Sequence, residues 1–354
     1  MKIVIVGGGA SGLVSALAIK EKNPRNDVLV IDRNNKLGKK LRATGNGKCN
    51  MCNLFNIKGQ YLNEERAKKL FNEINVEQLI KFFNNHNIAT INHDGYIYPY
   101  SESANMLTDT LINEAKKLGV KFISECEALD YTNNKLITSK GTYPFDKLVI
   151  ASGLISQPKL GADAKFVLNL SKHGYKVYPL YPALLPIKTV ESTKEVNGLR
   201  REVRVRLVYK GKTYFDEEGE LQFKKDGLSG IVIYHASSLY LRNHLSSAEL
   251  LIDFLPNTKF NGKFENYFVS DLASYLKKKG NPKEVHFHIK GFYDANDSVA
   301  TIGGVSLDNV DSSFNSKIEK NVYIIGEALN QDGLCGGYNL MWAFTSALKV
   351  SAII

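Results

Sequence analysis

Three glycines and one carboxylate near the N-terminus have the types and spacing needed to hold a nucleotide. Gly7, Gly9 and Gly12 follow an apolar run that ends at Val6, and Asp32 ends a second apolar run twenty residues after Gly12. Glycine permits a tight turn after a strand and lets the backbone approach a pyrophosphate, which the first amides of the next helix stabilise. A carboxylate at the end of the second strand can accept both hydroxyls of an adenosine ribose and would repel a 2′-phosphate. The spacing therefore predicts a dinucleotide site that disfavours NADP.

Hydrophobic periodicity predicts the elements that must position these residues. Residues 3–6 and 28–31 read as buried strands, and residues 13–19 read as the helix between them, which is the order that the motif requires. Strand and helix patterns go on alternating to about residue 185. They return near residue 299 and end in a strand over 322–325 and a helix over 338–353.

The middle of the chain has a different pattern. From Arg201 to Phe223 apolar and charged residues alternate, as in antiparallel strands with one face in water. Helical patterns follow around 230–241 and over 264–279. We therefore predict an α/β fold, in which a split Rossmann-like domain of residues 1–185 and 296–354 carries an inserted, mainly antiparallel-β plus helical domain of residues 186–295.

Composition limits the classes of partner. The chain has 354 residues and a net charge of +10, but its basic residues are scattered and form no aromatic-interleaved stripe. This pattern favours a solvated basic surface that attracts anionic cofactors and a small-molecule substrate, and it disfavours nucleic acid. No apolar run approaches the roughly twenty residues of a membrane span. We expect a cytoplasmic protein without a membrane partner, and the pattern predicts no particular oligomeric state.

The last strand and helix indicate which nucleotide is held. Gly326 and Glu327 end the strand, and Gly337, Tyr338 and Asn339 begin the helix, which returns to the nucleotide domain. The unpaired amides and the dipole of a helix N-terminus stabilise the negative charge that a reduced flavin carries at N1. These residues favour FAD; a glycine-rich loop that simply ends an α/β domain is the open alternative.

Residues 44–50, Thr-Gly-Asn-Gly-Lys-Cys-Asn, resemble the "SGGGRCN" stretch of the bacterial aminoacetone-oxidase-like flavoproteins, which are NAD(P)/FAD-dependent oxidoreductases. Further matching segments follow in the family's order: 95–101, 151–161, 228–230, 301–305 and 326–343. The resemblance covers nearly the whole chain and implies a glutathione-reductase-like FAD-binding domain. The chain departs from the family pattern at Lys48, at Asn330 and over 162–164, which puts details of the substrate pocket in question.

The resemblance also implies which residues bind a noncovalent FAD. The first glycine turn would hold the pyrophosphate, the end of the second strand the adenosine, and the last helix the flavin ring. A solvated surface position is the open alternative for Lys39 and Lys40. The implied set is Gly7, Gly9, Ala10, Ser11, Gly12, Asp32, Arg33, Lys39, Lys40, Thr44, Gly45, Asn46, Gly47, Cys49, Asn50, Ala128, Ala151, Ser152, Gly153, Gly326, Glu327, Gly337, Tyr338, Asn339 and Leu340.

Candidates for chemistry beside the flavin are Cys49, Tyr98 and Lys159. Cys49 and Cys52 form a CxxC that could exchange electrons as a dithiol, although Cys52 falls where the family usually carries threonine. The four cysteines and seven histidines show no metal-ligand spacing, so no metal is expected. A structural role is the alternative for each of these residues.

We predict an FAD-dependent oxidoreductase that passes a hydride from NAD(P)H through flavin N5 to an organic acceptor, for example an enone or alkene. The chain has a single glycine fingerprint, so NAD(P)H would be a transient co-substrate. Two alternatives stay open: an FAD-dependent oxidase of the amine or aminoketone type, and a flavin redox sensor or binding protein.

Overall fold

The computed structural model describes all 354 residues and divides them into two compact units. Unit 1 consists of Met1–Tyr181 and Ala300–Ile354, and unit 2 consists of Pro182–Val299. Each unit has its own buried apolar cluster. None of the helices is both long and apolar enough to cross a membrane.

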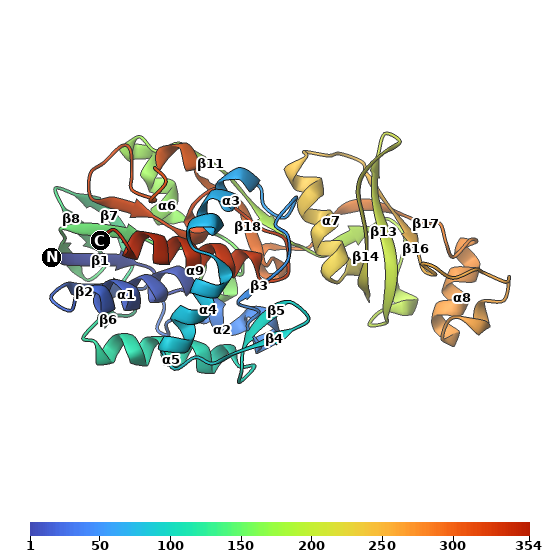
Figure 1. Cartoon of the computed structure of the whole chain (residues 1–354). Helices are drawn as coiled ribbons and strands as arrows, with labels where there is room; N and C mark the ends of the chain where they lie inside the picture. Colours follow the sequence, from blue (N-terminus) through green and yellow to red (C-terminus); the bar gives the residue numbers. More distant parts are fainter. The chain divides into compact units, whose positions relative to one another are not determined.

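A five-stranded parallel sheet forms the centre of unit 1 (Figure 1). Its order is β19 (Val322–Ile324), β10 (Lys147–Ile150), β1 (Lys2–Val6), β2 (Asp27–Ile31) and β6 (Lys121–Ile123). The strands are almost wholly apolar because helices cover a parallel sheet on both faces. The chain leaves β1 toward β2, whereas β10 lies on the other side of β1, so the carboxyl end of β1 is a topological switch point, where such sheets bind ligands.

Two helices pack side by side against this sheet (Figure 1). They are α1 (Ala10–Lys22), which follows β1, and α9 (Tyr338–Ser351), the last helix of the chain. The predicted strand–helix–strand start and the predicted final strand and helix are confirmed. The α/β fold class with a Rossmann-type domain is therefore confirmed as well.

Smaller elements complete unit 1. Three small sheets have the strand orders β3-β5-β4, β7-β8-β9 and β11-β18. The α5 helix begins after Ser103, whose side chain accepts the Met106 amide and so caps the helix. The bounds are α2 (Lys39–Ala43), β3 (Cys52–Asn53), α3 (Glu64–Glu73), α4 (Val76–Asn85), β4 (Thr90–His93), β5 (Tyr96–Pro99), α5 (Ala104–Lys117), β7 (Ala128–Thr132), β8 (Lys135–Thr138), β9 (Gly141–Pro144), α6 (Lys165–Asn169), β11 (Val177–Ala183) and β18 (Ala300–Val305).

Unit 2 is built on a closed antiparallel barrel. Alternate residues of its longest hairpin point inward, and Val203, Val205 and Leu207 are fully buried. Closure removes the exposed strand edges that would otherwise pair with other chains. The barrel order is β12 (Ile187–Thr189), β15 (Gly227–Ser229), β14 (Lys212–Lys224), β13 (Arg200–Tyr209), β16 (Glu249–Asp253) and β17 (Val285–Phe292), with α7 (Ile231–Arg242) and α8 (Ser270–Lys279) outside it. The predicted additional antiparallel-β and helical domain is confirmed.

One predicted helix of unit 2 is wrong in extent. Instead of a helix over 264–279, a single 3₁₀ turn spans Phe264–Asn266 and α8 starts at Ser270. Phe268 turns into the apolar cluster of unit 2, and the backbone at Val269 is extended, so the helical hydrogen bonds are interrupted between the two pieces.

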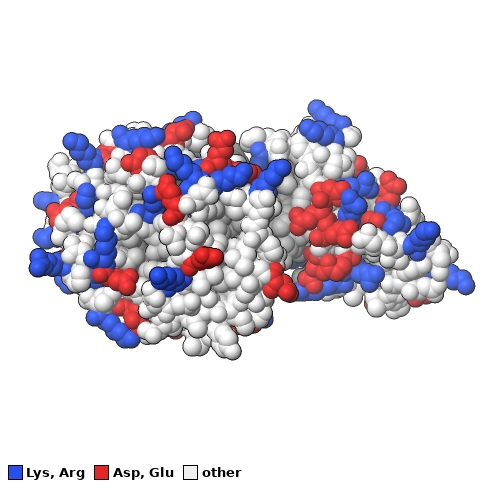
Figure 2. Space-filling view, in the orientation of Figure 1, with Lys and Arg blue, Asp and Glu red and all other residues white.

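Charged side chains are unevenly distributed over unit 2. Figure 2 shows acidic side chains gathered over the barrel strands, with lysine or arginine side chains among them and also at the end that carries α8. On the face of unit 1 shown in the same view, both signs are interspersed. A scattered basic surface, as the composition predicts, thus describes unit 1 better than it describes unit 2.

Candidate functional site

The residues predicted to hold a cofactor gather at the carboxyl edge of the parallel sheet. Because the carboxyl ends of parallel strands meet at one edge, segments far apart in the sequence converge there. The sites are the turn from β1 to α1 (Gly7–Gly12), the end of β2 (Asp32, Arg33), α2 and its following loop (Lys39–Asn50), the residues after β10 (Ala151–Gly153), the residues after β19 (Gly326, Glu327) and the start of α9 (Gly337–Leu340).

The first glycine turn has the shape that a bound pyrophosphate needs. Gly7 has φ +104°, and a Cβ there would lie 2.4 Å from the Ala151 carbonyl oxygen. A Cβ at Gly12 would lie 1.8 Å from the Gly7 carbonyl oxygen, so these two glycines are required by packing. A Cβ at Gly9 would meet nothing within 4 Å, and no side chain caps the N-terminus of α1. The uncapped amides therefore face open space beside Gly9.

Asp32 holds the turn from the side of β2. Its two carboxylate oxygens accept the Gly8 and Asn34 amides, each at 2.7 Å. Burial raises the pKa of Asp32, and the two backbone hydrogen bonds partly oppose this shift. Each oxygen keeps a lone pair, so the carboxylate can still accept a ribose hydroxyl.

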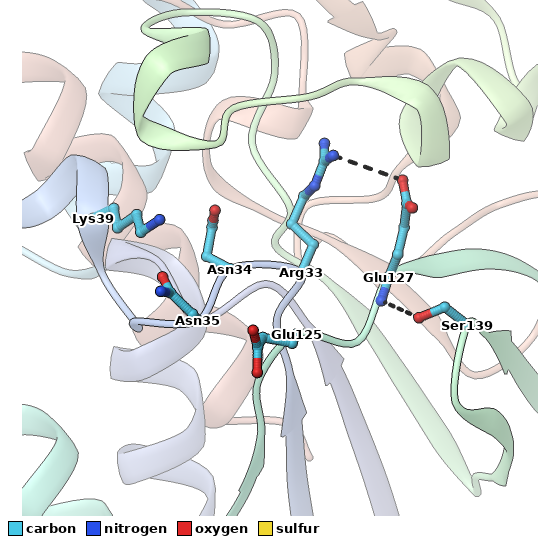
Figure 3. A pocket seen from close by; sticks show the side chains of 7 residues that line it. All are labelled: Arg33, Asn34, Asn35, Lys39, Glu125, Glu127 and Ser139. Carbon is cyan, nitrogen blue, oxygen red and sulfur yellow. Dashed lines mark hydrogen bonds and ion pairs between the residues drawn. The ribbon is translucent and has the colours of Figure 1, made fainter.

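A polar pocket of about 400 Å³ lies beside Asp32, beyond the end of β2 (Figure 3). Arg33 at its rim forms an ion pair with Asp163 at 2.8 Å and lies 3.9 Å from Glu127. The predicted adenine contact, Ala128, does not line the pocket, whereas its neighbour Glu127 does. The lining residues are Arg33, Asn34, Asn35, Lys39, Glu125, Glu127 and Ser139. Of these, the sequence indicated Arg33 and Lys39; the position of Asn34 and Asn35 directly after a central strand is a signal that could have found them.

Lys40 lies apart from Lys39, in a charged network with Glu327. The Lys40 Nζ lies 2.6 Å from the Glu327 Oε2 and 2.5 Å from the Ser156 Oγ. Ser156 in turn donates to the Glu327 Oε1 at 2.8 Å, and its own amide donates to Thr301. Both charged side chains are largely shielded from solvent. The network ties α2, the residues after β10 and the residues after β19 together, and no pattern in the sequence indicated Ser156.

The start of α9 meets the Thr44–Asn50 loop. Gly337, the N-cap, has φ +89°, and a Cβ there would lie 2.7 Å from the Asn50 Oδ1. No side chain caps α9 and no acid lies in its first turn. Asn339 folds back, and its side chain bonds both the amide and the carbonyl group of Gly333. The N-terminus of α9, which no side chain caps, thus lies at the edge of the loop, as the flavin prediction requires.

Two buried polar atoms without hydrogen-bond partners indicate whether this edge of the sheet fits a cofactor. The Asn50 Oδ1 and the Ser152 Oγ are buried and have no hydrogen-bond partner. Buried polar atoms without partners are rare in folded proteins and call for a ligand or water. Both atoms belong to residues predicted to touch FAD; Ser152 lies against Gly7 of the glycine turn, and the Asn50 Oδ1 lies against Gly337 at the start of α9. The residues present therefore fit an FAD, whose flavin the α9 amides would face.

Other residues that were predicted to contact FAD make contacts within the protein itself. Tyr338 is buried, and its carbonyl oxygen accepts the Tyr61 hydroxyl at 2.7 Å. Leu340 packs against the apolar cluster of unit 1. Thr44 donates to the Leu41 carbonyl oxygen at 2.6 Å. At Tyr338 and Thr44 the backbone also takes part in these internal contacts, since the Thr44 amide donates to the Leu41 carbonyl oxygen and the Thr44 carbonyl oxygen accepts the Cys49 amide.

The three candidates for chemistry differ sharply in their surroundings. Cys49 and Cys52 are buried, and burial raises the pKa of their thiols to about 11 and about 12. A thiol with so high a pKa is protonated at neutral pH and is a poor nucleophile. Tyr98 is half-buried on β5, and burial raises its pKa, so its hydroxyl also stays protonated. Lys159 is exposed in the short 3₁₀ turn over Pro158–Leu160.

We expect the CxxC to be inert toward thiol reagents. At pH 8 a thiol with a pKa of about 11 is ionised in about one molecule per thousand. In the native protein a disulfide reagent should therefore react rapidly with at most the partly exposed Cys335, whereas denaturant should reveal all four thiols. Reducing the flavin should leave the count unchanged; a gain of two thiols would instead establish a redox-active pair.

Aromatic side chains form an exposed patch next to this edge. The rings of Phe55 and Tyr96 meet edge to face at 4.8 Å, with 43% and 38% of each residue exposed. A Cβ at Gly336 would lie 3.3 Å from the Tyr96 ring, so the patch borders the residues that lead into α9. Tyr100 on the same small sheet edge is more exposed still. Such a patch can hold a flat ring by stacking.

Comparisons with known proteins agree with this geometry. The family model described as HI0933-like protein Rossmann domain matches residues 1–352. A 3-dehydro-bile acid Δ(4,6)-reductase of Clostridium scindens is 26% identical, with 98% of this chain and 97% of that protein covered. A ribosomal RNA dihydrouridine synthase of Escherichia coli is 28% identical, with 97% and 95% covered. The solved structure of a 3-ketosteroid Δ1-dehydrogenase from Sterolibacterium denitrificans has a TM-score of 0.55 at 10% identity, over 99% of this chain and 98% of that one, and shows a shared fold.

Proposed function

Because the chain belongs to the HI0933-like family of Rossmann-type FAD-dependent oxidoreductases, we propose that it reduces a carbon–carbon double bond conjugated to a carbonyl group. The names of the two full-length relatives carry this proposal. A Δ(4,6)-reductase of a 3-oxo steroid acid and a synthase of dihydrouridine both add hydrogen to such a bond. The aminoacetone oxidase activity suggested by the sequence resemblance is the alternative.

We favour a uracil ring in RNA as the substrate. The chain carries a net charge of +10, which attracts a polyanion far more strongly than a steroid acid with a single charge. The exposed Phe55–Tyr96 pair beside the α9 edge offers a stacking surface for a flat base. This substrate replaces the small molecule that the sequence alone favours, and a steroid enone is the second candidate because of the bile acid reductase relative.

The residues at the edge of the sheet have distinct roles in this function. FAD, when bound, would supply the hydride chemistry that links NAD(P)H to the substrate. The uncapped amides of α1 would bind the pyrophosphate, and the N-terminus of α9 would stabilise negative charge on the flavin ring. Asn50 and Ser152 supply polar atoms that the fold leaves unpaired. The Tyr98 hydroxyl stays protonated, so it can donate a hydrogen bond to the carbonyl oxygen of a substrate.

Anaerobic mixing of the FAD-loaded protein with NADPH or NADH tests this proposal. We expect the flavin absorbance to bleach rapidly with one of the two nucleotides. It should then recover on addition of a uridine-containing RNA, with dihydrouridine as the product. Recovery with a steroid enone but not with RNA would select the second candidate. Bleaching by amines, with peroxide formed once air is admitted, would contradict the reductase and establish the oxidase.

A further inference from the structure

We propose that unit 2 binds single-stranded RNA through a surface formed by residues 257–283 near α8. This inference rests on the proposed function, because it identifies a part of the chain that binds the RNA substrate. We define the Lys-Phe surface as Lys259, Phe260, Lys263, Phe264 and Tyr267. It has the two chemistries that single-stranded nucleic acid requires, namely cations for phosphates and rings for bases.

The rings of the Lys-Phe surface form one connected group. Phe260 lies 4.8 Å from Phe264 and 5.8 Å from Tyr267, measured between ring centroids. All three residues are partly exposed, and the Tyr267 hydroxyl donates to the Lys259 carbonyl oxygen at 3.0 Å. This hydrogen bond fixes the loop that carries Lys259 against the rings. Base stacking on such rings tolerates any sequence because every base has a π-face.

The cations of the Lys-Phe surface are available to a ligand. Lys259 and Lys263 are exposed, and neither forms an ion pair with a carboxylate. By contrast, Lys277 is paired with Glu265 and Lys278 with Glu195. Figure 2 shows lysine side chains at this end of unit 2, away from the acidic side chains of the barrel strands. The two unpaired ammonium groups therefore present a local positive charge to phosphates.

A cavity of about 570 Å³ opens beside these residues. Lys259 and Phe260 line it together with the amide side chains of Asn257 and Asn281. Lys283 also lines it; its Nζ donates to the Leu255 and Thr258 carbonyl oxygens at 2.6 and 3.0 Å and pairs with Asp253 at 3.2 Å, so its charge is already neutralised. Asparagine amides can pair with base edges, as they do in known recognition of adenine. An anionic lipid headgroup would use the cations but has no use for the amides and rings, so RNA is the occupant that we infer.

The arrangement explains why the chain lacks a recognisable nucleic-acid motif. Lys-Phe occurs twice, four residues apart, which is too short for a stripe in the sequence. The 3₁₀ turn at Phe264–Asn266 and the interruption before α8 bring Phe260, Phe264 and Tyr267 together. The proposed surface differs from the expectation that the basic residues are merely scattered, and the binding experiment below tests which of the two holds for this part of unit 2.

Binding of a fluorescein-labelled twelve-nucleotide single-stranded RNA to the FAD-loaded full chain tests the inference. The variant K259A/K263A should bind about tenfold more weakly. The slope of log affinity against log salt should also shrink by about 1.4, since single strands lose about 0.7 per phosphate contact. Phe260→Leu should weaken binding about fivefold with an unchanged slope, because a stacked base is lost and no charge is removed.

A matched control removes the same charge elsewhere in unit 2. Lys210 and Lys212 flank the tip of the β13–β14 hairpin, are exposed, and lie beside Tyr209 and Tyr214. K210A/K212A should change RNA affinity less than twofold, and all variants should keep the flavin spectrum and the rate of bleaching by NADPH. Equal losses in both double variants, or a loss confined to the hairpin variant, would overturn the inference.

The failure of this inference and the failure of the proposed function give different results. Wild-type protein that binds the RNA but forms no dihydrouridine would contradict the proposed substrate and leave the Lys-Phe surface standing. Dihydrouridine formation with unchanged binding by K259A/K263A and by Phe260→Leu would overturn the surface alone. Binding to phosphatidylglycerol vesicles without binding to RNA would overturn the inference and would identify an anionic membrane as the ligand of the Lys-Phe surface.

Discussion

Replacement of Gly9 by aspartate is expected to abolish FAD binding and to leave the fold intact. Gly9 is the N-cap of α1 with an extended backbone, φ −89° and ψ −161°, so an L-residue fits there without strain. An added Cβ meets nothing within 4 Å. An aspartate at an N-cap stabilises a helix by only a few tenths of a kcal/mol relative to glycine. The same carboxylate would cover the uncapped amides and repel a pyrophosphate, so the dissociation constant for FAD should rise at least about 100-fold, which is about 2.8 kcal/mol.

Titration of the apoprotein with FAD, followed by the change in flavin fluorescence, measures this effect. Gly9→Asn is the matched control, because asparagine has nearly the same shape and caps the helix without a charge. The asparagine variant should lose about tenfold at most, and both variants should unfold at or above the temperature of wild-type apoprotein. FAD affinity that is equal in the two variants would show that space, rather than charge, decides binding. An aspartate variant that keeps FAD would place the pyrophosphate elsewhere.

Replacement of Lys40 by methionine should lower the free energy of unfolding by about 2 kcal/mol, since it leaves a shielded carboxylate without its cation. The Glu327 side chain is 25% exposed and the Lys40 side chain 29%, so solvent screens the pair only in part. Ser156 would remain as the one side-chain donor to Glu327. The double variant K40M/E327Q should recover about half of the loss, because glutamine is neutral and can still accept the Ser156 hydroxyl.

Urea unfolding of the four proteins of this double-mutant cycle measures the coupling. Lys39→Met serves as the control. Lys39 is the neighbouring residue on α2, but it lines the polar pocket beside Asp32 and forms no ion pair. Its free energy of unfolding should change by less than about 0.5 kcal/mol, as is usual for a surface substitution. A cycle with no coupling between Lys40 and Glu327 would show that the pair contributes nothing to stability. FAD affinity measured on the same variants separates that result from a role in binding.

Local patterns in the sequence predicted the elements of both units. The apolar runs of β1 and β2 and the glycine turn between β1 and α1 are specified by neighbouring residues, as is the Ser103 cap of α5. The alternation of Val203, Val205 and Leu207 likewise gave the barrel strands, since every second residue of a half-buried strand points inward. The helix expected over 264–279 was wrong because burial of Phe268 in the core of unit 2 overrides local helical periodicity.

The candidate site was predictable as a set of segments but not as a set of contacts. Lys39 and Lys40 are adjacent and read alike in the sequence, yet one lines a pocket and the other pairs with Glu327, 287 residues away. Ser156 could not be identified from the sequence, because its role depends on the ion pair between Lys40 and Glu327, which are far apart in the chain. The thiols of Cys49 and Cys52 have the spacing of a redox motif, and burial alone removes their reactivity.

What the sequence by itself determined is the Rossmann-type half of this protein, the flavin-binding character of its glycine turns and the presence of a second, antiparallel unit. These features depend on residues that are neighbours along the chain, so periodicity and spacing record them. What the tertiary structure decided is which amides, carboxylates and lysines meet at the sheet edge, and that two short Lys-Phe pairs form one surface with a cavity. Those contacts join residues from separate elements, and long-range packing, which leaves no local pattern, sets them.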